Sequence, residues 1–319
     1  PSYVAEYLRS AVAEKLLYRQ SGRWHVAAAD ETYASLGLPG TIRDLVAHRL
    51  ARLSPLACRV AEAAAVLGRE SEEELFLAVC GENEDDALEA VAELIEQHVF
   101  ESGVRFAHDK LREAAYARLD EERRPKLHRR AVEAIEKRYD SEDELRRHDA
   151  ELARHCDAAG LHEKATGYYA RAAETAVGSG ACREAIDLMN RAIALDESRT
   201  NDSPKSRRER HAHWQRVLSF AQFGLGDLPA SSEHARRSLD EVGIHLPRTP
   251  RGWQARLAGE ALQQTAHFLL PRSMVHSRAS KPVLRDVAMA AQKFSEGRYY
   301  TDEKTVMLAS GLFAVNSAD

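Results

Sequence analysis

Histidines beside acids and a thiol are the side chains of this sequence whose types suggest chemistry. His155, Cys156 and Asp157 are a base, a nucleophile and an acid in consecutive positions. Consecutive residues of a helix point about 100° apart, so these three cannot face one another and the sequence predicts no catalytic role for them. His211 and His213 fail as metal ligands for the same reason, because a helix presents a histidine pair to a metal at i and i+4.

His108 is the remaining candidate, because it lies where a short strand runs into a helix. Residues 104–107 are predicted to be the strand, and an amphipathic helix is predicted to begin near Asp109, which we expect to cap it. A rigid junction of this kind would hold the His108 imidazole as a hydrogen-bond donor. The imidazole could equally cap the helix itself, or lie half-buried beside Phe106, and the sequence leaves both interpretations open.

Phosphate-binding loops are absent from the sequence. It contains no G-x-x-x-x-G-K-[ST] motif, and no acidic residue closes an apolar strand as a magnesium ligand would. Gly178-Ser179-Gly180 lacks both the lysine and a preceding strand, so it is predicted to be a turn. We therefore expect this chain to bind no ATP, to hold no cofactor or metal, and to have no enzymatic activity of its own.

The composition favours packed helices. The 319 residues are 44% hydrophobic, only 7% aromatic and 30% charged, and the common residues Ala, Leu, Glu and Arg are strong helix formers. A net charge of −5 gives no general attraction to nucleic acid or anionic lipid. No apolar run approaches the roughly 20 residues that span a bilayer. The four cysteines are widely spaced, which favours reduced thiols and a cytoplasmic location, and the first residue, Pro1, indicates an internal start.

Residues 41–120 are predicted to form a winged-helix domain, because several short helices precede a two-stranded hairpin. Ser54 is a helix cap followed by proline at the first helical position, and Ser102-Gly103 is a turn. The predicted helices are 41–53, 56–67, 71–80 and 85–98, and the hairpin strands are 99–101 and 104–106. The 85–98 helix, which precedes the wing, carries five acidic residues and no Lys or Arg, so we expect no direct contact with DNA.

Residues 121–319 are predicted to be helical throughout. Ala165, Tyr169 and Ala172 repeat the small-large-small spacing of Ala185, Met189 and Ala192, which lets two helices nest closely. Further helices are expected at 205–225, 229–242, 252–270, 281–297 and 305–315, with a polar exposed loop at 196–206. These pairs resemble tetratricopeptide repeats, and we expect the array to be incomplete at its C-terminal end. Tyr168 or Tyr169 is a candidate anchor for a bound partner.

Several of these motifs resemble the signal-transduction ATPases of the STAND class. Phe106-Ala107-His108-Asp109 resembles the His-Asp motif that ends the winged helix of that family, and residues 1–9 resemble the tail of its Gly-Asn-Pro lid motif. Residues 50–55, 63–70 and 123–128 are also similar to the family, in the family's order. The resemblance divides the chain into the end of a lid region (1–38), a winged-helix domain (41–120) and tetratricopeptide-like repeats (121–319).

The resemblance implies a regulatory function. In the family, the histidine reaches the phosphates of ADP in a preceding nucleotide-binding domain, so His108, and Pro1 through the lid, would contact nucleotide held by a domain absent from this chain. That parent would use ATP or ADP with magnesium, and would carry a kinase, cyclase or transcription-regulator output. The repeats would bind an effector protein, peptide or small molecule and support self-assembly, with no nucleic-acid or membrane partner. The alternative is a free-standing helical-repeat scaffold that binds peptides or proteins without nucleotide control.

Overall fold

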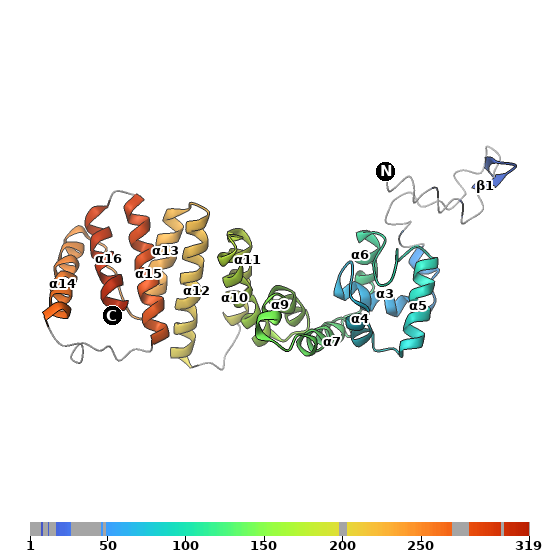
Figure 1. Cartoon of the computed structure of the whole chain (residues 1–319), viewed down its shortest axis with the longest axis horizontal. Coiled ribbons are helices and arrows are strands. Elements are labelled where there is room, and N and C mark those ends of the chain that lie inside the picture. Colours follow the sequence, from blue (N-terminus) through green and yellow to red (C-terminus); the bar gives the residue numbers. More distant parts are fainter. Residues whose placement is uncertain are drawn as a thin grey trace. The chain divides into compact units, whose positions relative to one another are not determined.

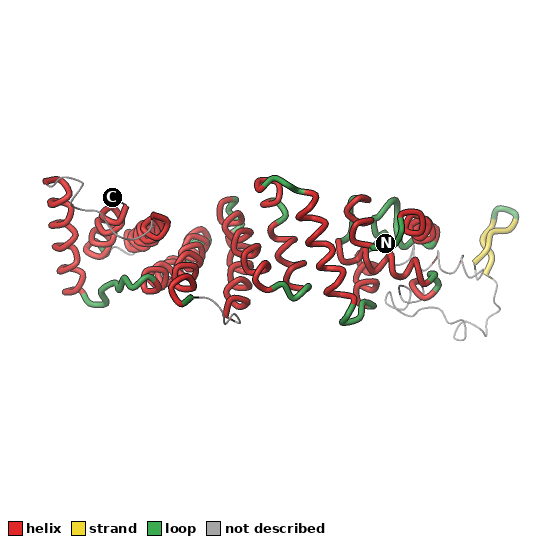
Figure 2. Tube along the Cα trace, turned by 90° about the horizontal axis from the view of Figure 1, so that it is seen from below, coloured by secondary structure: helices red, strands yellow, loops and turns green. Residues whose placement is uncertain are grey.

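Helices dominate the part of the chain that the structure describes. The computed structural model describes residues 17–26, 49–197, 203–269, 281–300 and 303–318, together with the single positions 8, 12 and 46. The protein is mainly α, as predicted (Figure 1; Figure 2). Its contacts divide it into two units, residues 1–140 with 158–160 and residues 141–157 with 161–319.

A strand, a Ser-Gly turn and a second strand follow one another near residue 20, as the residues between Tyr18 and Val26 predict. Strands β1 (Leu17–Gln20) and β2 (Arg23–Val26) pair antiparallel, with Tyr18 opposite His25. Ser21 and Gly22 both have positive φ, at 51° and 81°. A two-residue turn with this backbone matches the twist of the strands that it joins, and glycine adopts it without strain.

Helix α3 (Pro55–Leu67) is the centre of the first unit. Ser54 accepts a hydrogen bond from the Ala57 backbone N–H, so the predicted cap and the proline after it start the helix as expected. Most of α3 is buried, including a run of alanines that allows close approach of its neighbours. Those neighbours are α4 (Glu73–Cys80), α5 (Glu84–Glu96), α6 (Asp109–Ala117) and α7 (Arg123–Arg138).

Three extended segments, rather than the predicted two, lie beside these helices. The predicted hairpin pairs at Phe100 and Phe106, and Glu70 from the segment after α3 pairs with Arg105. The Phe106 N–H donates to the Arg69 carbonyl at 2.9 Å, and the two phenylalanine rings pack edge to face. The third segment was missed because residues 69–71 show no strand-like alternation in the sequence.

The second unit is an array of helices packed largely in consecutive pairs. Helices α10 and α11, α12 and α13, and α15 and α16 form the pairs, and α13 also packs against α15 (Figure 1). Helix α14 packs against α16. The bounds are α8 (Glu142–Arg146), α9 (Asp149–Ala158), α10 (His162–Gly178), α11 (Cys182–Glu197), α12 (Pro204–Gly224), α13 (Leu228–Glu241), α14 (Pro250–Leu269), α15 (Lys281–Tyr300) and α16 (Lys304–Ala318).

The predicted small-large-small contact between α10 and α11 is confirmed by burial. Ala165, Ala172 and Met189 are among the residues that pack at or near full burial. Tyr168 and Tyr169 are 8% and 6% exposed, so the expectation that one of them is an exposed anchor is wrong. The Arg171 guanidinium lies over the Tyr168 ring, and the Tyr169 hydroxyl donates to Asp157 of α9 at 3.3 Å.

The predicted loop at 196–206 is wrong at its start. Helix α11 continues to Glu197, and Asp196 within it is fully buried. Arg210 and His211 of α12 bind its carboxylate, which stabilises the buried charge. A polar composition indicated exposure here, whereas the polar side chains in fact pair across two helices.

Several predicted features lie outside the described residues. Pro1, nearly all of residues 1–9 that resemble the lid motif, and the start of the predicted helix at 41–53 belong to this group. Within the described part of the chain, no helix combines the length and the apolar character that crossing a membrane requires.

Candidate functional site

Hydrogen bonds and aromatic packing hold the backbone that leads to His108. The Ala107 N–H donates to the Val99 carbonyl at 2.9 Å, next to the bond between Phe106 and Arg69. Phe100 and Phe106 are both buried, with ring centroids 4.8 Å apart. The segment that ends at Ala107 is therefore fixed on both edges, and α6 begins directly after it.

His108, not Asp109, caps α6. The His108 backbone is extended, and its Nδ1 accepts a long hydrogen bond of 3.4 Å from the Lys110 N–H. Asp109 is the first residue of the helix, where its negative charge suits the helix dipole, and its Oδ1 lies 3.8 Å from Arg69 Nε. The expectation that Asp109 caps the helix was wrong, and the alternative that the His108 imidazole caps it is confirmed.

The cap occupies Nδ1 of His108 and leaves Nε2 available to donate a hydrogen bond. An imidazole whose Nδ1 accepts a hydrogen bond carries its proton on Nε2 when it is neutral. No acceptor for Nε2 lies within hydrogen-bonding distance among the described residues, and the ring is half-buried. Capping through Nδ1 and donation through Nε2 are therefore compatible in one residue.

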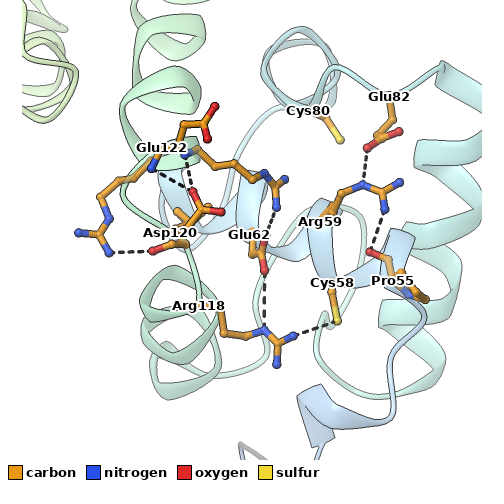
Figure 3. Close-up of polar contacts among 12 residues, drawn as sticks. Pro55, Cys58, Arg59, Glu62, Cys80, Glu82, Arg118, Asp120 and Glu122 are labelled. Carbon is orange, nitrogen blue, oxygen red and sulfur yellow. Dashed lines mark hydrogen bonds and ion pairs between the residues drawn. The ribbon is translucent and has the colours of Figure 1, made fainter.

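A buried carboxylate joins α3 to the end of α6 and to α7. Glu62 of α3 is 7% exposed, and its two oxygens lie 3.7 Å from Arg118 Nε and 2.5 Å from Arg123 Nη1 (Figure 3). One turn along α3, Arg59 binds Glu82 at 2.8 Å (Figure 3). The network ties the C-terminal end of α6 and the start of α7 to α3.

The two thiols near this network are poor nucleophiles. Burial raises the pKa of the Cys58 thiol and outweighs the opposing effect of the nearby Arg118 guanidinium. Burial likewise raises the pKa of Cys80. Because the thiolate is the reactive form of cysteine, both residues stay protonated near neutral pH and serve as small packing residues.

A second polar cluster, in the second unit, joins three helices through His213. Its Nδ1 donates to Asp286 of α15 at 3.0 Å, and its Nε2 donates to Glu174 of α10 at 2.9 Å. Arg216 Nε lies 2.7 Å from the other oxygen of Asp286. Sequence reasoning missed this cluster, since its partners lie 39 and 73 residues from His213.

The charge state of His213 follows from these contacts. The hydrogen bond to Asp286, reinforced by the one to Glu174, raises the pKa of His213 to about 9 against the opposing effects of burial and Arg216. Burial opposes ionisation of Asp286, but the bond from His213 and the charge of Arg216 still lower its pKa. The imidazole is therefore charged and doubly bonded at neutral pH, so it cannot act as a general base.

The other histidines singled out in the sequence are held apart. His211 binds Asp196, whereas His213 binds Asp286 and Glu174, so the two rings share no site. His155 Nε2 lies 3.8 Å from Glu151, while Asp157 accepts from Arg191 at 2.8 Å. Among the described residues no three His, Cys, Asp or Glu side chains gather as metal ligands would.

Comparison with known proteins adds no family to these observations. Neither the protein-family models nor the curated proteins contain a match to this chain. The resemblance to signal-transduction ATPases therefore remains a prediction from the motifs.

Proposed function

We propose that this chain is the regulatory and sensor region of a signal-transduction ATPase, and that His108 detects the nucleotide state. The observation that carries the proposal is the junction itself. A half-buried imidazole caps α6 through Nδ1 directly after a backbone segment that is bonded on both edges. Such a ring is preorganised to donate from Nε2 to a phosphate oxygen of ADP bound in a preceding domain.

In this proposal the first unit is a winged helix. The three extended segments, at 69–71, 99–101 and 104–107, supply the wing, and α3 to α6 supply the helices. The exposed acidic residues of α5, such as Asp85 and Glu89, make its surface unsuited to phosphates, which supports a domain contact rather than DNA binding.

The second unit would be the effector-binding part. Helices packed in consecutive pairs support a tetratricopeptide-like array, in which each pair contacts its neighbours and exposes a long surface. The effector would be a protein, a peptide or a small molecule. Its binding would be coupled to the ATP or ADP state, with magnesium, of the nucleotide domain, and to self-assembly of the parent.

The coding sequence upstream of Pro1 gives the first test. The proposal expects a G-x-x-x-x-G-K-[ST] loop within a few hundred residues before it. If a complete reading frame begins near Pro1 instead, the alternative of a free-standing peptide-binding scaffold replaces this proposal.

The second test separates nucleotide sensing from helix capping at His108. In the full-length protein, His108→Ala removes both roles, whereas His108→Asn keeps a good cap on a side chain too short to reach a phosphate. Loss of a charge-assisted hydrogen bond of about 1.5–3 kcal/mol should speed ADP release roughly tenfold or more in both variants. ADP release that is restored to the wild-type rate by His108→Asn would assign His108 to capping alone.

A further inference from the structure

A cavity of about 570 Å³ opens among α13, α14, α15 and the first turn of α16. Its volume falls in the range of small-molecule sites. Its apolar walls come from Pro247, Val306 and Trp253, and Trp253 stacks on the buried ring of Phe294 with centroids 5.9 Å apart. Segments far apart in the sequence thus build one concave surface within the second unit.

Three guanidinium groups and three carboxylates line this cavity. The Cζ atoms of Arg236 and Arg298 lie 5.4 Å and 4.8 Å from the centroid of the Phe294 ring, and Arg248 lines the opening. A guanidinium that lies over an aromatic face keeps its N–H edge available for an acceptor, so the ring orients these groups before a ligand arrives.

Each acidic residue of the cavity already has a partner. The Arg237 guanidinium binds Glu233 at 3.0 Å and that of Arg298 binds Glu303 at 2.6 Å, whereas Asp240 accepts a hydrogen bond of 2.8 Å from the exposed imidazole of His245. Arg236 and Arg248, by contrast, form no ion pair with any described residue. The cavity therefore presents two guanidinium groups, those of Arg236 and Arg248, that pair with no described carboxylate and lie beside an apolar wall.

We propose that this cavity binds a small organic anion, in which a carboxylate, sulfonate or phosphate group is attached to an apolar body. The anionic group would bind Arg236 and Arg248, and the body would pack against Pro247, Val306 and Trp253. Only the role of this ligand as an effector rests on the proposed function. Binding itself requires no nucleotide domain, so either proposal can fail without the other.

The test uses two fluorescent probes with one body and different charge. The full chain is titrated with 1-anilinonaphthalene-8-sulfonate, an anion, and with N-phenyl-1-naphthylamine, its neutral counterpart. The anion should bind at least about tenfold more tightly, because a bond from a guanidinium to an anion adds to the apolar contact. Trp253 lines the cavity, so Trp253→Phe should lower the energy transfer to the bound probe more than Trp214→Phe does.

Charge-removing variants then identify the residues. Arg236→Gln and Arg248→Gln should each weaken binding of the anion about tenfold and leave the neutral probe unchanged. Arg251→Gln is the matched control, because Arg251 is exposed on α14 close to the cavity but does not line it. Arg248 is exposed, so its substitution does not affect folding even if that of Arg236 does. Equal binding of both probes, or unchanged affinity in Arg248→Gln, would overturn the proposal.

Discussion

The charged His213 imidazole should make the stability of the second unit depend on pH in an unusual direction. Its pKa rises from an ordinary 6.5 to about 9 in the folded chain. The folded state therefore binds one more proton than the unfolded state between these values. The stabilisation is fully present below pH 6.5, declines as the pH rises, and is lost above about pH 9.

The magnitude follows from the same two values. The difference between the two pKa values corresponds to about 3 kcal/mol of stability, since a pKa difference of one corresponds to about 1.4 kcal/mol. The His213 side chain is 31% exposed, so solvent screening should reduce the effect to about 2 kcal/mol. Asp286 keeps its ion pair with Arg216 when the imidazole is lost, which limits further damage.

Urea unfolding of the wild type and of His213→Gln at several pH values measures this contribution. The free energy of unfolding should differ by about 2 kcal/mol at pH 6, and the two proteins should converge near pH 9.5. His245→Gln is the control, because the His245 side chain is 77% exposed and its loss should change stability by less than about 0.5 kcal/mol. An NMR titration should place the midpoint of the His213 ring near 9. A midpoint near 6.5, or a difference that stays constant with pH, would refute the reasoning.

Two further predictions concern the first unit and the whole chain. Glu62→Gln should lower the free energy of unfolding by about 1–3 kcal/mol, because Arg118 and Arg123 lose a buried partner. Glu82→Gln breaks a more exposed ion pair with Arg59 and should lower it by less than about 1 kcal/mol. Equal effects of the two substitutions in urea unfolding would contradict a special role for Glu62. Calorimetry of residues 1–319 with ATP and magnesium up to about 1 mM should show no binding, because the sequence has no phosphate-cradling loop, and micromolar affinity would contradict this.

Local signals in the sequence predicted the helices well. Ser54-Pro55 started α3 where expected, because capping and the fixed φ of proline act within a few residues. The spacing of Ala185 and Met189 predicted which face of α11 is buried, because helical periodicity is also local. The hairpin at 17–26 followed from its Ser-Gly turn in the same way.

Long-range polar contacts could not be predicted from the sequence. Glu62 stands in a run of alanines, and nothing near it indicates partners at 118 and 123. Asp196 was assigned to an exposed loop because its neighbours are polar, and its burial depends on charges of the following helix. The cavity at Arg236 likewise draws its walls from four helices and two connecting segments. Each of these features depends on which helix packs beside which, and periodicity alone does not specify that choice.

Ion pairs between helices help to determine which helices of the second unit pack together. A carboxylate of one helix meets a guanidinium of another at four successive contacts, each at 2.6–2.8 Å: Asp149 with Arg171, Asp157 with Arg191, Asp196 with Arg210, and Asp286 with Arg216. These contacts run from α9 through α10, α11 and α12 to α15. The alanine-rich helix faces would tolerate a slip of one turn, because small side chains fit many registers. A slip would leave a buried charge without its partner, which costs several kcal/mol, so the ion pairs disfavour the wrong registers even where they add little net stability to the right one.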